Sequence, residues 1–270
     1  MIVFEDVSFV HSTGVRALDH VNLSVGGKET VAVVGENGAG KTTLVKQVTG
    51  LLKPTSGRVT VDGEATTKKT TAELSRKVGV AFQNPDHQLF SESVEEEVAF
   101  GLRNFGFDAE AIKRRTDWAL DFFGLSRYRG SSPLTLSGGE KKRLTIACAL
   151  SWDPEVVILD EPTVGQDAIQ KERLSGIVSM LQSSGKTVII VSHDIEFLWP
   201  LRPRTVVMSN GRILADGPSS KVLLDKEVLS KSRVTEPQLV RIYNGLGSRP
   251  SSPFADVPAA RRWIEEETRR

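Results

Sequence analysis

A glycine-rich loop between a predicted strand and a predicted helix restricts the fold of this 270-residue chain more than any other feature. Residues 30–34 predict a buried strand, and residues 44–48 predict a helix. The loop between them reads Gly35, Glu36, Asn37, Gly38, Ala39, Gly40, Lys41, Thr42 and Thr43. Such loops wrap phosphates with backbone N–H groups at a helix N-terminus, and the lysine meets the outer phosphates. The sequence therefore predicts an α/β fold that binds a nucleotide, with the Thr42 hydroxyl as a ligand of Mg²⁺.

Two adjacent carboxylates, Asp160 and Glu161, follow the apolar residues 156–159. Open α/β sheets bind ligands beyond the carboxyl ends of their strands, which is where this pair is expected. An acidic pair at a strand end is usually only solvated, and the phosphate-binding loop is what favours a functional role here. We expect Asp160 to hold Mg²⁺ or its water shell. Glu161 is then placed to polarise the water that attacks the terminal phosphate, while Lys41 and the metal stabilise the transferred charge.

A histidine, His193, follows another predicted strand at residues 187–191. In the expected sheet this strand is the neighbour of residues 156–160, so His193 is expected to reach the same terminal phosphate. A lone histidine is more often structural than catalytic, and the pattern by itself leaves both roles open.

Short apolar runs recur along the chain with helical patterns between several of them, which is typical of buried parallel strands with crossover helices. These runs are residues 30–34, 78–82, 156–159, 187–191 and 205–208. Alternating patterns at residues 2–9, 21–25 and 58–61 predict an antiparallel sheet beside the parallel one, with a turn at Asp62 and Gly63.

The pattern divides the chain into a large domain, residues 1–217, and a C-terminal part, residues 218–270. Within the large domain, residues of about 85–154 predict a helical subdomain inserted between two core strands. The C-terminal part predicts a small helical extension, an irregular linker at residues 248–253 and a charged tail. An apolar face of the extension is expected at Leu239, Val240, Ile242 and Tyr243.

Composition and charge exclude several functional classes. Lys and Arg total 35 against 34 Asp and Glu, so a net charge of +1 gives no overall field that attracts nucleic acid or an anionic membrane surface. The N-terminus lacks the basic start and apolar run of a signal peptide, which predicts a protein that stays in the cytoplasm. No apolar run approaches the roughly 20 residues needed to span a bilayer. If the chain serves transport, other chains make the pore.

A second motif lies between the phosphate-binding loop and the acidic pair and consists of Leu136, Ser137, Gly138, Gly139 and Glu140. Together with Gln83, Asp167 and His193, this set of motifs resembles the nucleotide-binding subunits of ABC ATPases over residues 2–217. The resemblance implies a P-loop NTPase (RecA-like) core and a dimer that clamps two ATP molecules. Each ATP then lies between Lys41 of one subunit and Ser137, Gly138 and Gly139 of the other. Physical chemistry agrees, since Ser137 is expected to cap a helix whose N–H groups face the γ-phosphate.

The resemblance also implies roles for residues outside these loops. Gln83 would touch Mg²⁺ and the attacking water. Asp167 aligns with the aspartate of a loop that usually reads Gly-Leu-Asp in the family, although Gln166 here replaces the leucine. Glu140 stands where many relatives carry glutamine, a common substitution. Adenine is usually stacked on an aromatic residue near the N-terminus. His11 is the favoured candidate here and Phe9 the competing one, because alternation with Val7 favours a core-facing Phe9.

Residues 82–90 and 94–101 are similar to a narrower group, the ATPases of energy-coupling factor (ECF) transporters, which import vitamins or cobalt and nickel ions. The resemblance implies a homodimer or heterodimer beneath a transmembrane coupling protein and a small substrate-capturing membrane protein, on the cytoplasmic face of the membrane. Residues 218–247 resemble the extension through which these ATPases pair.

The residues after Gln83 are expected to form the groove in which the coupling protein docks. Four acidic side chains lie nearby, at Glu92, Glu95, Glu96 and Glu97. They either bind basic helices of the coupling protein or are solvated and stabilise the N-terminus of a helix through its dipole. Two alternative functions are an ATPase of another ABC transporter class and a soluble ABC protein that acts on ribosomes or DNA. The second usually needs two ATPase domains in one chain or long coiled-coil arms, and neither pattern occurs in this sequence.

Overall fold

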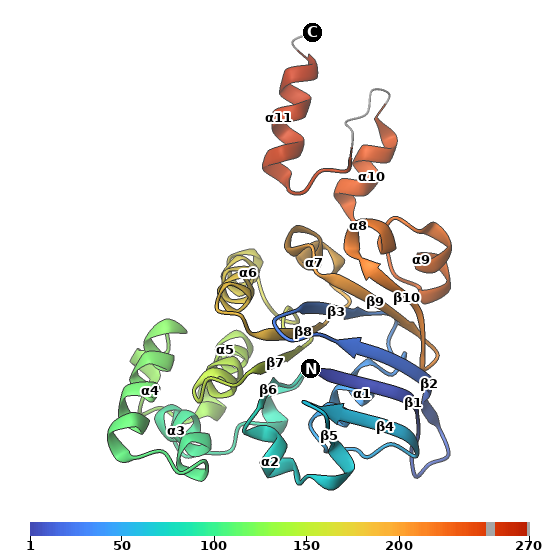
Figure 1. Ribbon diagram of the computed structural model, residues 1–270. Coiled ribbons are helices and arrows are strands. Elements are labelled where there is room, and N and C mark those ends of the chain that lie inside the picture. Colours follow the sequence, from blue (N-terminus) through green and yellow to red (C-terminus); the bar gives the residue numbers. More distant parts are fainter. Residues whose placement is uncertain (247–251, 269–270) are drawn as a thin grey trace.

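The computed structural model describes residues 1–246 and 252–268 (Figure 1). Its centre is a six-stranded sheet with the order β10-β9-β3-β8-β7-β6, in which β10 alone runs antiparallel to its neighbour. The strands are β3 (Thr30–Val34), β6 (Val78–Ala81), β7 (Val156–Asp160), β8 (Thr187–Val191), β9 (Arg204–Ser209) and β10 (Arg212–Pro218). All five apolar runs predicted as strands are confirmed, and β8 lies directly beside β7 as expected.

A second, four-stranded antiparallel sheet has the order β2-β1-β4-β5. Its strands are β1 (Ile2–Val10), β2 (Arg16–Val25), β4 (Ser56–Val61) and β5 (Glu64–Ala65). The predicted turn between β4 and β5 is present, and Asp62 and Gly63 both have positive φ, at 50° and 79°. This conformation matches the twist of a tight hairpin and favours the Asp-Gly sequence.

Successive side chains of β3 point to opposite faces of the sheet and belong to two separate apolar clusters. Val31 and Val33 join an apolar cluster with β1, β2, β4 and helix α1 (Lys41–Val48), so this cluster fills the space between the two sheets. Ala32 and Val34 face the opposite side and pack in a cluster with the helices there. A strand that is buried on both faces needs the continuous apolar run seen in β3.

Helical segments fill the chain between β6 and β7 and project to one side of the sheets (Figure 1). They are η2 (Pro85–His87), α3 (Val94–Asn104), α4 (Ala109–Phe122), η3 (Ser126–Tyr128), η4 (Pro133–Thr135) and α5 (Gly138–Leu150). Before β6 lie η1 (Thr66–Lys68) and α2 (Thr71–Ser75). The predicted insertion of helices between two core strands agrees with this order.

After β7 the chain forms α6 (Ala168–Ser183) and α7 (Ile195–Leu201), and after β10 it forms α8 (Ser219–Val222), α9 (Lys226–Ser232), α10 (Gln238–Gly245) and α11 (Val257–Thr268). The predicted apolar face of α10 is confirmed only in part. Leu239 and Val240 are buried, whereas Ile242 is 46% exposed.

The C-terminal helices are continuous with the main core. Val222, Leu223 and Leu229 are buried in the same cluster as β7 and β8. Phe254 is also buried, and its carbonyl accepts a hydrogen bond from Trp199 Nε1 at 2.8 Å, which attaches the segment before α11 to α7. Most of the predicted linker at residues 248–253 lies outside the described residues. Within the part of the chain that the structure describes, no helix has the length and apolar character needed to cross a bilayer.

Candidate nucleotide-binding site

The glycine-rich loop joins β3 to α1 as predicted, and two of its glycines are required by close backbone contacts. A Cβ atom at Gly35, where φ is 150°, would lie 2.1 Å from the Met208 carbonyl oxygen. A Cβ atom at Gly40, where φ is 100°, would lie 2.3 Å from the Ala17 carbonyl oxygen. Only glycine adopts these conformations without strain or clash. The loop is therefore held tightly against β9 and β2 at the N-terminus of α1.

Lys41 is folded back onto the loop that precedes it. Its ammonium donates hydrogen bonds to the carbonyl oxygens of Gly35 at 2.7 Å and Glu36 at 2.9 Å. Burial lowers the pKa of Lys41, and the nearby carboxylates of Glu161 and Asp160 oppose that shift. The result is a shielded cation at the helix N-terminus, where a phosphate group is favoured by the backbone N–H groups as well.

A cavity of about 460 Å³ lies in front of this loop. It brings together predicted site residues from four separate segments, namely His11, Asn37, Gly38, Gly40, Lys41, Thr42, Thr43, Gln83 and Glu161. His11 lines the cavity, whereas Phe9 is buried in the core and contacts the edge of the His11 ring at 4.9 Å between centroids. This arrangement favours His11 over Phe9 as the ring that stacks on a base.

Asp160 lies at the end of β7 and is fully buried. One of its carboxylate oxygens, Oδ2, accepts a hydrogen bond from Thr42 Oγ1 at 3.1 Å, and the other, Oδ1, has no partner in the described structure. Burial raises the pKa of Asp160, the Thr42 hydrogen bond opposes the shift, and the Glu161 charge adds to it. A buried, unsatisfied carboxylate oxygen beside a threonine hydroxyl fits the donor set that Mg²⁺ prefers.

No cluster of three or more His, Cys, Asp or Glu side chains suited to a metal occurs within residues 1–246 and 252–268.

Glu161 follows β7 in a left-handed backbone conformation, with φ of 46°. Its N–H donates to the Val191 carbonyl oxygen at 2.8 Å, and this bond ties the residue to the end of β8. Its carboxylate Oε2 lies 2.8 Å from Nδ1 of His193. His193 thus contacts the expected base directly, and 59% of its side chain is exposed. A backbone held in an uncommon conformation at a strand end is a frequent feature of functional sites.

The second predicted motif lies at the N-terminus of α5, outside this cavity. Ser137 and Glu140 form a capping box: Ser137 Oγ accepts from the Glu140 N–H at 3.4 Å, and Glu140 Oε2 accepts from the Ser137 N–H at 2.9 Å. Hydrogen bonds from Tyr128 and Ser137 lower the pKa of Glu140 to about 2. Asp167 caps α6 by accepting from the Gln170 N–H at 2.8 Å.

Three residues of the cavity were missed by the sequence prediction. Val15, just before β2, and Arg16 and Ala17, at its start, line the same cavity as His11. Their position in the β1–β2 hairpin gives no local signal, because the cavity depends on how that hairpin packs against the loop before α1. Val15 is 61% exposed and offers an apolar contact on the same side as His11.

Comparison with known proteins agrees with this geometry. A profile of the family described as ABC transporter matches residues 18–164. A putative ABC transporter ATP-binding protein of Pyrococcus furiosus is 43% identical over 251 residues, which cover 93% of this chain and 95% of that protein. The energy-coupling factor transporter ATP-binding protein EcfA of Methanothermobacter thermautotrophicus is 39% identical over 248 residues, which cover 91% of this chain and 80% of that protein.

Solved structures share the fold over most of their length. The cbiO1 protein of Clostridium perfringens, described as part of the ABC transporter complex cbiONQ, has a TM-score of 0.74 at 35% identity, covering 90% of this chain and 98% of its own. A dimeric ATP-binding cassette in a post-hydrolysis state, bound to ADP and Pi, also has a TM-score of 0.74, at 28% identity and with coverage of 81% and 98%. The predicted P-loop NTPase fold is thereby confirmed. This chain belongs to the ABC transporter family and is one of its ATP-binding, ATP-hydrolysing subunits.

Proposed function

We propose that this protein is the ATPase subunit of an energy-coupling factor importer, bound peripherally at the cytoplasmic face of the cell membrane. The observation that supports this subclass most strongly is the 39% identity to the EcfA protein over 91% of this chain. Its partners would be a second ATPase subunit, identical or related, a transmembrane coupling protein and a small membrane protein that captures the substrate. The cargo would be a vitamin or a transition-metal ion, such as cobalt or nickel, recognised by the capture protein.

For the chemical step, we propose that Lys41 and the N–H groups of the loop bind the β- and γ-phosphates and that Glu161 orients and deprotonates the attacking water. Thr42, Asp160 and Gln83 would hold Mg²⁺, which when bound neutralises charge on the phosphate oxygens. His193 would keep the Glu161 carboxylate aimed and contact the terminal phosphate. The unpartnered Oδ1 of Asp160 supports the metal assignment.

The second motif would act on the nucleotide of the other subunit. Ser137, Gly138 and Gly139 lie away from the cavity that holds Lys41. The capping box occupies the N–H groups of Ser137 and Glu140, so those of Gly138 and Gly139 would be the ones presented to an anion. Asp167 would lie at the same interface, because the Gln166 side chain is next to Gly139. A dimer would therefore complete both ATP sites.

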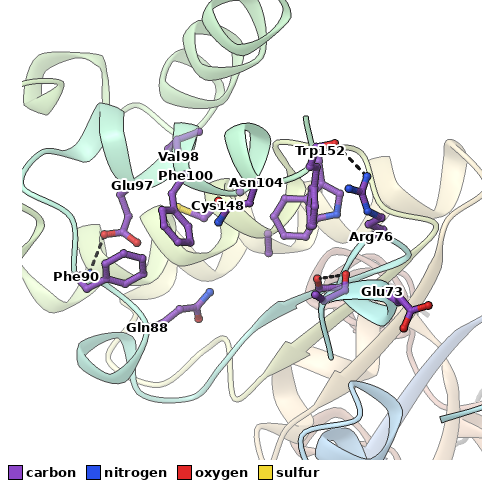
Figure 2. A pocket seen from close by; sticks show the side chains of 15 residues that line it. Glu73, Arg76, Gln88, Phe90, Glu97, Val98, Phe100, Asn104, Cys148 and Trp152 are labelled. Atoms are coloured by element: carbon purple, nitrogen blue, oxygen red, sulfur yellow. Dashed lines mark hydrogen bonds between the residues drawn. The ribbon is translucent and has the colours of Figure 1, made fainter. Parts of the chain in front are cut away.

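A groove between α2 and α3 is the proposed docking site for the coupling protein (Figure 2). It has a volume of about 430 Å³ and includes a strongly apolar wall of aromatic rings. Phe90 and Phe100 are 64% and 42% exposed and contact each other edge to face, with 4.8 Å between ring centroids. Exposed aromatic pairs beside a groove are typical of protein interfaces.

The acidic residues at this groove correct part of the docking hypothesis. Glu97 is buried, and its carboxylate accepts hydrogen bonds from the N–H groups of Phe90 at 2.8 Å and Ser91 at 2.7 Å, so it shapes the loop rather than receiving a partner. Glu95 pairs with Arg129 at 2.6 Å. Glu92 and Glu96 are exposed and would be the ones to meet a basic coupling helix.

The docking proposal is tested by a double substitution, Phe90→Ser with Phe100→Ser. Both side chains are exposed, so the fold is expected to persist, while capture of the coupling protein in detergent falls by at least about tenfold, the size expected when central aromatic contacts are removed. Trp118 and Phe122 form a second exposed aromatic pair, stacked at 5.5 Å on α4, and their replacement by serine is the matched control. Equal capture by both double variants would contradict docking at the groove.

A further inference from the structure

A buried lysine, Lys142, lies in the first half of α5, shortly after the Ser137–Glu140 capping box. Only 2% of its surface is exposed. Lysines are almost never fully buried unless their charge is satisfied, so this position needs an explanation. Burial lowers the pKa of Lys142 to about 8, and the charges of Asp160 and Glu161 oppose that shift.

The ammonium of Lys142 is satisfied by backbone carbonyls from two other segments. It donates to the oxygen of Phe82 at 2.8 Å, of Gln83 at 3.2 Å and of Asp160 at 3.0 Å. An ammonium has three donors, and all three are used. In the described part of the chain, no carboxylate oxygen lies within 4.0 Å of its nitrogen, so these contacts fix geometry without neutralising the charge.

These carbonyls belong to the residues that carry the proposed chemistry. Gln83 follows β6 and lines the nucleotide cavity, and Asp160 ends β7 immediately before Glu161. Lys142 itself is on the helix whose N-terminus faces the other nucleotide of the proposed dimer. One side chain therefore links three segments: the Gln83 loop, the end of β7 and α5.

We propose that Lys142 is a positioning residue for ATP hydrolysis: it locks the Gln83 loop and the end of β7 onto α5. When α5 shifts, Gln83 and the Asp160–Glu161 peptide then move together with it. Removing the ammonium leaves the buried carbonyl of Asp160 and the part-buried carbonyls of Phe82 and Gln83 without this donor and lets these segments move apart. The proposal rests on the roles proposed for Gln83 and Asp160.

The neighbouring lysine provides a matched control. Lys141 Nζ pairs with Asp86 Oδ1 at 2.7 Å, and Asp86 is 60% exposed in its side chain. The Lys141 side chain is 16% exposed, but the bond itself lies at the surface, and ion pairs at the surface contribute little to stability. Lys141→Met therefore removes an ammonium from the same helix without touching the carbonyls of the site.

The experiment measures Mg²⁺-dependent ATP turnover and, separately, ATP affinity for wild type, Lys142→Met, Lys142→Arg and Lys141→Met in the full chain. Lys142→Met is expected to lower kcat by roughly 10–100-fold, as for residues that orient metal-site ligands, with ATP affinity within about threefold of wild type. Lys142→Arg keeps a charged donor and should recover part of kcat. Lys141→Met should match wild type.

Different results would contradict the positioning role of Lys142 and the proposed function of the protein. A wild type without Mg²⁺-dependent hydrolysis would count against the proposed function. Normal wild-type turnover together with unchanged kcat in Lys142→Met would overturn the positioning role alone. Loss of folding or of ATP binding in both Lys142 variants would also overturn it, because Lys142 would then act on the fold and not on the catalytic step.

Discussion

At the scale of single residues, burial and hydrogen bonding hold two opposite charges, which we propose serve a phosphate and a cation. Lys41 is held by two carbonyl oxygens of its own loop, so its ammonium is placed before any ligand arrives. Asp160 keeps one carboxylate oxygen without a partner in the described structure. Pre-placed charges in a shielded site need little rearrangement during reaction, which is how such sites stabilise charge in the transition state.

Glu161→Gln tests the proposed base. The amide is nearly the same size and keeps a hydrogen-bonding group near His193, but it cannot accept a proton. ATP binding should persist while kcat falls by roughly 10²–10⁴-fold, the usual contribution of a general base. The variant should also remain trapped as a dimer in the presence of ATP. Turnover at the wild-type rate would exclude Glu161 from this role.

At the scale of elements, the capping box at α5 stabilises a helix start that the proposed dimer needs in a defined position. Glu140 receives hydrogen bonds from Tyr128 Oη and from Ser137, and these hold its pKa at about 2, below the ordinary 4.5. A carboxyl with a lowered pKa in the folded state contributes stability above its unfolded pKa and loses that contribution as the pH falls towards the folded value.

Tyr128→Phe is therefore expected to lower the free energy of unfolding at pH 7 by about 1–2 kcal/mol, the loss of one hydrogen bond to a charged group. The difference from wild type should be full above pH 4.5, the ordinary pKa of Glu140, and shrink as the pH falls below it. Urea unfolding at pH 7 and at about pH 3, well inside the interval between the two pKa values, measures both differences. A difference that is the same at both pH values would contradict the link to Glu140.

Elements were predictable where one local pattern decides the structure. Strands β3 and β8 have the predicted bounds because their β-branched residues are buried on both faces. Strand β10 was missed, since its side chains are exposed or half-buried and only pairing with β9 holds it in the sheet. Contacts between distant segments gave no sequence signal, and Lys142 is the main example, because its partners are backbone carbonyls brought together by the fold.

At the scale of the whole molecule, the C-terminal helices are both part of the core and a candidate dimer surface. Removing all residues after 217 would take away the buried Leu223 and Val240 and uncover core residues in the same cluster, such as Trp199, so a full deletion would test stability more than pairing. A hollow of about 1090 Å³ between α10 and α11 instead presents Ile242 and Ile264, which are 46% and 44% exposed. These side chains can be changed without opening the core.

The double substitution Ile242→Asp with Ile264→Asp tests this surface. Charged groups at an apolar contact must be desolvated on pairing, so the nucleotide-free dimer should weaken by at least about tenfold. Sedimentation velocity over a range of protein concentrations measures the change, with Trp118→Asp and Phe122→Asp on α4 as the control. Identical sedimentation of wild type and the Ile242/Ile264 variant would reject pairing through this part of the chain.

We propose that this ATPase works beneath membrane partners of the energy-coupling factor type. The most direct test is capture of the tagged protein from detergent-solubilised native membranes, a high-salt wash and mass spectrometry of what stays bound. We expect one transmembrane coupling protein, one or several small and very hydrophobic capture proteins, and any second ATPase subunit. Recovery of ribosomal or DNA-processing proteins in their place would contradict it.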